Sequence, residues 1–128
     1  MAQLEVIDET WIAAPAEQVA AVVADPRRCR QWWPEGELTV AEDRGREGIR
    51  WRMAPGRPLS GSVEIWVEAV RDGAVLHYFI RADRAGRPWS RRELAHLRRA
   101  HEVRAKQTFW AVKDELEARE DAEAGRVT

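Results

Sequence analysis

The chain has 128 residues, of which 45% are hydrophobic and 34% charged, and its formal net charge is −1. These values fit one domain of a soluble globular protein. The Arg-rich runs alternate with acids, which excludes the long basic stripe of a nucleic-acid-binding protein. No apolar run approaches the roughly 20 residues of a membrane span, and the N-terminus lacks the apolar core of a signal peptide. We therefore expect a cytoplasmic protein.

Cys29 is the single cysteine of the chain, so it cannot form an intramolecular disulfide, in agreement with a reducing compartment. Arg27, Arg28 and Arg30 flank it and would lower the pKa of its thiol if they crowd it. With no general base near in sequence, an unreactive cysteine is the favoured interpretation.

The first quarter of the chain predicts one strand followed by two short helices. Leu4–Ile12 reads as the strand, and Ala16–Ala24 carries its valines at helical spacing. Pro15 stands where a helix begins, a position that tolerates a missing N–H. The Asp25-Pro26 pair ends the first helix near Ala24, because a residue before proline avoids helical geometry. A second short helix then runs from Pro26 to Trp32.

The rest of the chain predicts four strands and one long helix. Asp72-Gly73 is a strong hairpin signal between two of the strands. Ser90, with Glu93 three residues later, forms a capping box that begins the helix. This helix is predicted to end about Arg119, so residues 1–120 form a single domain and 121–128 a disordered tail. The four strands are predicted over Glu37–Asp43, Gly48–Ala54, Ser60–Val70 and Ala74–Arg81.

This order of elements predicts an α+β protein with an antiparallel sheet. The long helix must bury an apolar stripe, and the concave face of a curved sheet is the available surface. His101 and Thr108 make the middle of that stripe polar, which indicates a cavity between helix and sheet. At about 100° per residue, the stripe contains Leu94, Leu97, His101, Ala105, Thr108, Val112 and Leu116.

Several short motifs resemble those of one known superfamily. They are Ile12-Ala13-Ala14-Pro15, the helix 19–24 with the Asp25-Pro26 break, Trp32-Trp33-Pro34, and the helix end Phe109–Glu117. In these the chain resembles the START-like, or helix-grip, superfamily, and in particular its bacterial polyketide cyclase/dehydrase-like group. The resemblance implies a curved antiparallel sheet wrapped on the long C-terminal helix, with two short helices after the first strand. It also implies a hydrophobic ligand cavity. The superfamily pattern has seven strands, whereas five are placed here, so we expect five to seven.

The resemblance favours binding of a small hydrophobic molecule, aromatic, polyketide-like or lipid-like, in the internal cavity. One alternative is a cyclase or dehydratase in which His101, Tyr78 or Asp8 moves protons and the pocket orients a flexible substrate. A second alternative is a protein-interaction module without a ligand, which a cavity filled with Trp would favour.

The candidate ligand-binding residues come from the strands as well as the helix. Asp8 and Thr10 share a strand face with Ile12, so Asp8 is either buried and paired with an arginine (Arg50, Arg52 or Arg81) or wet at the sheet edge. Trp51 and Met53 share a face and fit a pocket wall, and Trp33 fits its mouth. The full set is Asp8, Thr10, Trp33, Trp51, Met53, Tyr78, His101 and Thr108.

Two histidines leave alternatives open. His77 and Tyr78 point to opposite faces of a strand, and the more apolar neighbours of Tyr78 favour it as the inward residue. His101 is either a polar pocket residue or a core-edge histidine hydrogen-bonded to the sheet. His96 and His101 cannot share a helix face as a zinc motif requires, and no phosphate loop is present, so we expect no metal and no cofactor.

The outer face of the long helix carries Val103 and Trp110, seven residues apart and pointing away from the stripe. Arg92, Arg99 and Lys106 surround them. A Trp with neighbouring Arg is a common interface composition, which suggests a homodimer through this face. The alternative is a monomer in which the basic side-chain stems cover the tryptophan.

Overall fold

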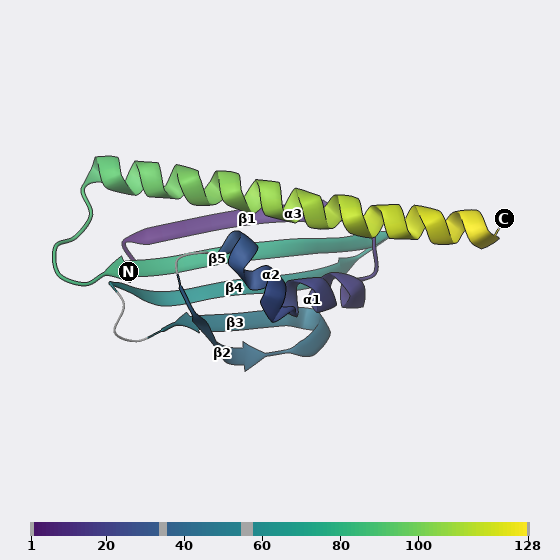
Figure 1. Ribbon diagram of the computed structural model, residues 1–128, viewed down its shortest axis with the longest axis horizontal. Coiled ribbons are helices and arrows are strands. Elements are labelled where there is room, and N and C mark those ends of the chain that lie inside the picture. Colours follow the sequence, from purple (N-terminus) through teal and green to yellow (C-terminus); the bar gives the residue numbers. More distant parts are fainter. Residues whose placement is uncertain (1, 34–35, 55–57, 128) are drawn as a thin grey trace.

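Five antiparallel strands form one sheet, with a long helix along one edge and two short helices on one face (Figure 1). The computed structural model describes residues 2–33, 36–54 and 58–127. The sheet order is β1-β5-β4-β3-β2. Within the described residues the strands are β1 (Leu4–Ile12), β2 (Leu38–Asp43), β3 (Gly48–Met53), β4 (Leu59–Val70) and β5 (Gly73–Arg84). The helices are α1 (Ala16–Ala24), α2 (Pro26–Trp32), the 3-10 turn η1 (Gly45–Glu47) and α3 (Arg91–Val127).

The predicted α+β class, the antiparallel sheet and the two short helices after the first strand are confirmed. The break between α1 and α2 lies at Asp25, whose extended backbone is what the following proline requires. The Asp25 carboxylate accepts a hydrogen bond of 3.0 Å from the backbone N–H of Arg27 and so caps α2. Helix α2 ends at Trp32, as the sequence predicts, and Pro34 lies outside the described residues.

The hairpin between β4 and β5 forms where the Asp-Gly signal predicts it. Its two loop residues are Arg71 and Asp72, because Val70 and Gly73 still pair across the strands. Asp72 takes the left-handed conformation, with φ of 66°. Gly73 is needed for a different reason: a Cβ there would lie 2.4 Å from the carbonyl oxygen of Ile12 on the neighbouring strand.

Strand β1 is an edge strand, and α3 lies along it (Figure 1). Basic side chains of α3 donate hydrogen bonds to backbone carbonyls of β1. Lys106 Nζ lies 2.8 Å from the oxygen of Glu9, and Lys113 Nζ lies 3.0 Å from the oxygen of Trp11. The helix therefore covers backbone groups that would otherwise attract a further strand.

Helix α3 begins with the predicted capping box and ends later than predicted. The Ser90 hydroxyl accepts a hydrogen bond of 3.1 Å from the N–H of Glu93, whose carboxylate accepts one of 3.0 Å from the N–H of Ser90. The predicted end near Arg119 is wrong, because the helix continues to Val127. Ion pairs one turn apart, such as Glu115 with Arg119, stabilise the helix up to its predicted end. The predicted disorder of residues 121–128 stays a prediction for solution measurements.

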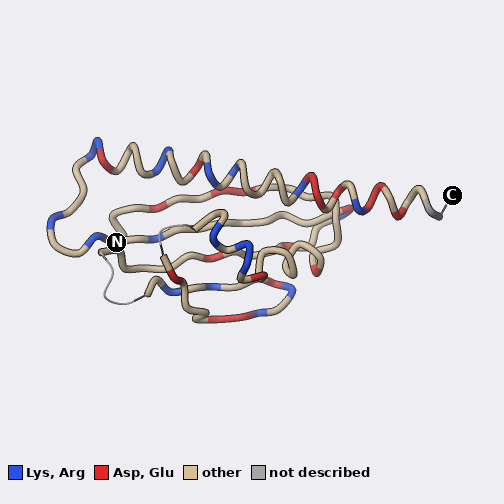
Figure 2. Tube along the Cα trace, in the orientation of Figure 1, with Lys and Arg blue, Asp and Glu red and all other residues tan. Residues whose placement is uncertain are grey.

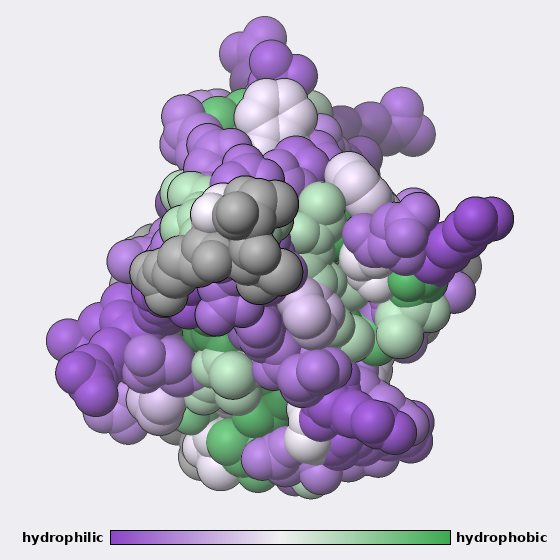
Figure 3. All heavy atoms as spheres, turned by 90° about the vertical axis from the view of Figure 1, so that its right-hand side faces the viewer, coloured by the Kyte–Doolittle hydropathy of each residue, from purple (hydrophilic) through white to green (hydrophobic). Residues whose placement is uncertain are grey.

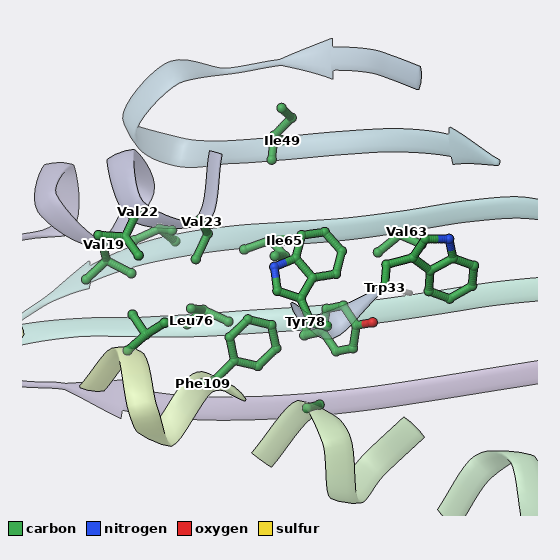
Figure 4. Close-up of a cluster of buried hydrophobic side chains, with 14 of the residues drawn as sticks. Val19, Val22, Val23, Trp33, Ile49, Val63, Ile65, Leu76, Tyr78 and Phe109 are labelled. Carbon is green, nitrogen blue, oxygen red and sulfur yellow. The ribbon is translucent and has the colours of Figure 1, made fainter. Parts of the chain in front are cut away.

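The core lies between the inner face of the sheet and the helices (Figure 4). Side chains of β1 alternate between buried and exposed along the whole strand. In α3 the buried face is formed by His101, Ala105, Phe109, Val112 and Leu116. Leu94 and Leu97, nearer the start of the helix, are half-buried. Among the described helices, none is long and apolar enough to span a membrane.

Candidate ligand-binding site

Aromatic rings fill much of the space between α3 and the sheet. The Trp32 ring, from the end of α2, lies 4.9 Å from that of Trp51 on β3 and 5.8 Å from that of Tyr78 on β5, measured between centroids. Phe109 of α3 completes the group, 5.1 Å from Tyr78 (Figure 4). All four side chains are buried. This aromatic cluster occupies the position at which the sequence predicts an internal cavity.

Trp33 and His101 form a second contact, between the end of α2 and α3. Their rings stack with centroids 5.5 Å apart and planes 21° from parallel. Trp33 is 3% exposed and His101 4% exposed, so the imidazole lies behind the indole and away from solvent. Both expected interpretations of His101, as a pocket residue and as a core-edge residue, require a buried side chain. The structure shows that the side chain is buried.

Two hollows adjoin Trp33. One, of about 200 Å³, has Trp33, Met53 and Leu59 in its wall. The other, of about 330 Å³, lies between the short helices and the β2–β3 pair, with Trp33 and Trp51 in its wall. Trp33, Gly36 and Glu37 line both. Trp33 therefore stands between two largely apolar hollows.

A third, broader depression has a different character. It measures about 590 Å³, and Glu17, Arg44, Arg46 and Glu47 contribute to its wall. Figure 3 looks onto the end of the molecule at which the β2–β3 turn lies, and hydrophilic side chains dominate that surface. Its charged lining does not suit an apolar ligand.

The eight candidate residues fall into three groups. Trp33, Trp51 and Met53 line the two hollows. Tyr78 and His101 are buried behind them, in the aromatic contacts, and line neither hollow. The remaining three, Asp8, Thr10 and Thr108, make polar contacts elsewhere in the structure. The ligand-binding role of the set stays a prediction.

The preference for Tyr78 over His77 as the inward residue is confirmed. Tyr78 is 1% exposed. His77 lies on the outer face of the sheet, where its Nε2 is 3.0 Å from a carboxylate oxygen of Glu68. The alternation of apolar residues along β5 was the signal that separated them.

Asp8 is buried, as predicted by the alternative in which it is paired. The basic residue that pairs with it is a lysine and not one of the expected arginines. Asp8 Oδ1 lies 3.0 Å from Nζ of Lys106 on α3, and its Oδ2 accepts a hydrogen bond of 3.1 Å from the Thr10 hydroxyl. Arg50 points to the outer face of the sheet, where it pairs with Glu64. The expected Arg50, Arg52 or Arg81 partner is therefore wrong, because these arginines lie on strand positions that alternate with the buried ones.

Thr108 lies at the margin of the buried face of α3, and Phe109 takes the central place. The Thr108 hydroxyl donates a hydrogen bond of 3.4 Å to the carbonyl oxygen of Gln31 in α2. Phe109 is fully buried. The signal for it was present in the sequence, since Ala105, Phe109, Val112 and Leu116 follow the same helical spacing.

Cys29 is half-buried in α2 and lines the 330 Å³ hollow. Burial raises the pKa of its thiol from 9.0 to about 11. The unreactive interpretation is therefore supported, and the flanking arginines do not lower the pKa. Arg28 instead donates two hydrogen bonds of 2.7 Å to the carboxylate of Glu115 on α3. These hydrogen bonds lower the pKa of Glu115 and connect α2 to α3.

Comparisons with known proteins show the fold. No family model and no curated protein matches this chain, whereas 38 chains of solved structures do. DR_A0006 from Deinococcus radiodurans is 16% identical, with a TM-score of 0.64 over 88% of this chain and 96% of that one. The Aha1 dimer from Colwellia psychrerythraea is 14% identical, with a TM-score of 0.64 over 89% of this chain and 96% of that one.

A START superfamily protein from Mycobacterium smegmatis is 13% identical, with a TM-score of 0.52 over 88% of this chain and 98% of that one. The five-stranded antiparallel sheet, the long C-terminal helix and the two short helices after β1 define the class: this chain has the helix-grip fold. The START-like resemblance predicted from its motifs is confirmed at the level of the fold.

Proposed function

We propose that this protein binds a small hydrophobic molecule, aromatic, polyketide-like or lipid-like, in the hollows on either side of Trp33. The observation that carries the proposal is the pair of apolar hollows that share the Trp33 indole as a wall. An indole offers a large apolar surface and one N–H donor, which suits an aromatic ligand with a polar substituent. Many proteins with this fold hold hydrophobic ligands, which agrees with the proposal.

The volumes limit the size of the ligand. Pockets for drug-sized molecules measure about 300 to 1,000 Å³. The hollows of about 200 and 330 Å³ each accept a molecule of one or two fused rings. A longer ligand requires the Trp33 ring to leave its stack on His101, which would join the two hollows.

Cys29 provides the variant that tests the larger hollow. Cys29→Phe places a ring inside it, whereas Cys29→Ala leaves it open and serves as the matched control. The probes are 1-naphthol for an aromatic ligand and decanoate for a lipid-like one. Two-dimensional NMR of the seven tryptophan indole N–H groups reports where each probe binds.

We expect saturable shifts of the Trp33 and Trp51 indole signals, with those of the exposed Trp11 and Trp110 unchanged. Cys29→Phe should weaken binding at least about tenfold, while Cys29→Ala keeps it. If neither probe causes saturable shifts, the proposal is wrong. If Cys29→Phe binds both probes as well as Cys29→Ala does, the larger hollow is not the binding site.

The protein-interaction module is a second candidate, and the aromatic cluster favours it. Trp32, Trp51, Tyr78 and Phe109 fill the interior that a deep cavity would need. Failure of both probes would leave this candidate as the better one. The cyclase or dehydratase alternative has less support, since its three expected proton carriers, Asp8, Tyr78 and His101, line neither hollow.

A further inference from the structure

The outer face of α3 carries a continuous exposed stripe. Its members lie within about 40° of Val103 around the helix, at about 100° per residue, and on the side opposite the buried Ala105 and Val112. Val103 and Trp110 are 40% and 58% exposed. The exposed members of the stripe are Arg92, His96, Arg99, Val103, Gln107, Trp110, Asp114 and Asp121, and Glu117, within the same angle, is half-buried.

The charges of this stripe are divided between its ends. Arg92 and Arg99 lie toward the N-terminus of α3, and Asp114 and Asp121 toward its C-terminus. When all faces of α3 are taken together, both signs of charge occur along its length (Figure 2). The helix macrodipole favours the reverse order, with anions near the N-terminus and cations near the C-terminus. None of these four side chains makes an ion pair with another described residue. The arrangement therefore adds nothing to the stability of the isolated helix.

We propose that this stripe binds the same stripe of a second copy of the chain, with the two α3 helices antiparallel. A twofold axis between Lys106 and Gln107 would place Val103 against the partner's Trp110. The same axis places Arg99 against the partner's Asp114 and Arg92 against the partner's Asp121, because facing residues are equally distant from the axis. The surface is thus complementary to itself, as a twofold interface must be.

The apolar pair supplies the centre of this contact. The Lys106 ammonium lies 5.9 Å from the centroid of the Trp110 ring, and more than half of the Trp110 side chain remains exposed beside it. An exposed Trp next to Val at the middle of a charged rim has the anatomy of an interface hot spot. In the antiparallel arrangement each Trp110 covers one Val103, and the opposed helix dipoles attract.

The size of the stripe indicates a reversible dimer. From Arg92 to Asp121 it is about 44 Å long at about 1.5 Å per residue, and a helix is about 10 Å wide. The projected area is therefore about 440 Å², near half of the roughly 800 Å² that each partner contributes to a standard interface. A monomer–dimer equilibrium in the micromolar range follows. The inference does not depend on the proposed ligand, since the stripe faces away from the hollows.

Charge reversals test the register. In Arg99→Asp, two Asp–Asp contacts form across the axis, and in Asp114→Arg two Arg–Arg contacts form. A one-to-one mixture of these two variants allows a heterodimer in which both contacts are again between opposite charges. Arg91→Asp and Glu123→Arg carry the same charge changes outside the stripe and serve as controls. Sedimentation velocity from about 1 to 100 μM measures the dissociation constant, and circular dichroism verifies folding.

We expect wild type and both controls to dimerise with the same dissociation constant. Each single reversal should weaken dimerisation about tenfold, and the mixture should restore it to the wild-type level. A wild type that stays monomeric over the whole range overturns the proposal. So does a dimer that the single reversals leave unchanged or that the mixture does not restore, since its interface then lies elsewhere.

Discussion

The ion pair between Asp8 and Lys106 gives the sharpest stability prediction. Asp8 lies on the buried face of β1, with 7% of its side chain exposed, whereas the Lys106 side chain is 41% exposed. Replacement of Lys106 by Met keeps the apolar stem and removes the charge. The Asp8 carboxylate then remains buried, with the Thr10 hydroxyl as its hydrogen-bond partner at 3.1 Å.

The expected cost lies between two known limits. Removal of one partner from a fully buried pair costs about 3 to 5 kcal/mol, and an exposed pair contributes about 0 to 1 kcal/mol. Because one partner is buried and the other wet, we expect Lys106→Met to lower the free energy of unfolding by about 2 kcal/mol. For a chain of this length that lowers the Tm by about 7 °C.

A double-mutant cycle isolates the pair. Asp8→Asn keeps the shape of the side chain without its charge and should cost about 1 kcal/mol. In Asp8→Asn/Lys106→Met no buried charge is left, so the double variant should be more stable than Lys106→Met alone. Urea unfolding monitored by circular dichroism gives the four free energies. If Lys106→Met costs under about 0.5 kcal/mol, or if the two costs add, the pair is not coupled and the reasoning is refuted.

Three further predictions concern single side chains. Hydrogen bonds from Arg87 lower the pKa of Glu93 from 4.5 to about 2. The difference in free energy of unfolding between wild type and Glu93→Gln should therefore be full above pH 4.5 and vanish as the pH falls to about 2. A difference that does not change with pH would contradict this. With a pKa of about 11 instead of 9.0, the Cys29 thiol should react with iodoacetamide at pH 8 about 100-fold more slowly in the native protein than in urea. Equal rates would show that burial does not protect it. In urea unfolding, Phe109→Ala should lower the free energy of unfolding by about 3 to 5 kcal/mol, and Thr108→Ala by under about 1 kcal/mol. Similar costs for the two variants would show that Phe109 is not the centre of the buried face of α3.

Local chemistry made much of the fold predictable. Pro15 and the Asp25-Pro26 pair bound α1 and α2 through sterics that act within one or two residues. The capping box of Ser90 and Glu93 sets the start of α3 by hydrogen bonds within one turn. Strand alternation likewise separated Tyr78 from His77. Each of these signals lies within the element that it specifies or directly beside its end.

The candidate site depended on contacts between distant elements. Alternation placed Asp8 on the inner face of β1, but its partner Lys106 comes from α3, and only the packing of that helix along the edge strand brings the two together. Trp32 and Trp33 are neighbours in sequence, yet one joins the aromatic cluster and the other separates two hollows. A repeat of hydrophobic residues indicates that a side chain is buried. Whether that side chain fills a cavity or lines one depends on the volumes of all the side chains that pack around it. In this protein those side chains come from four parts of the chain, which only the tertiary structure brings into contact.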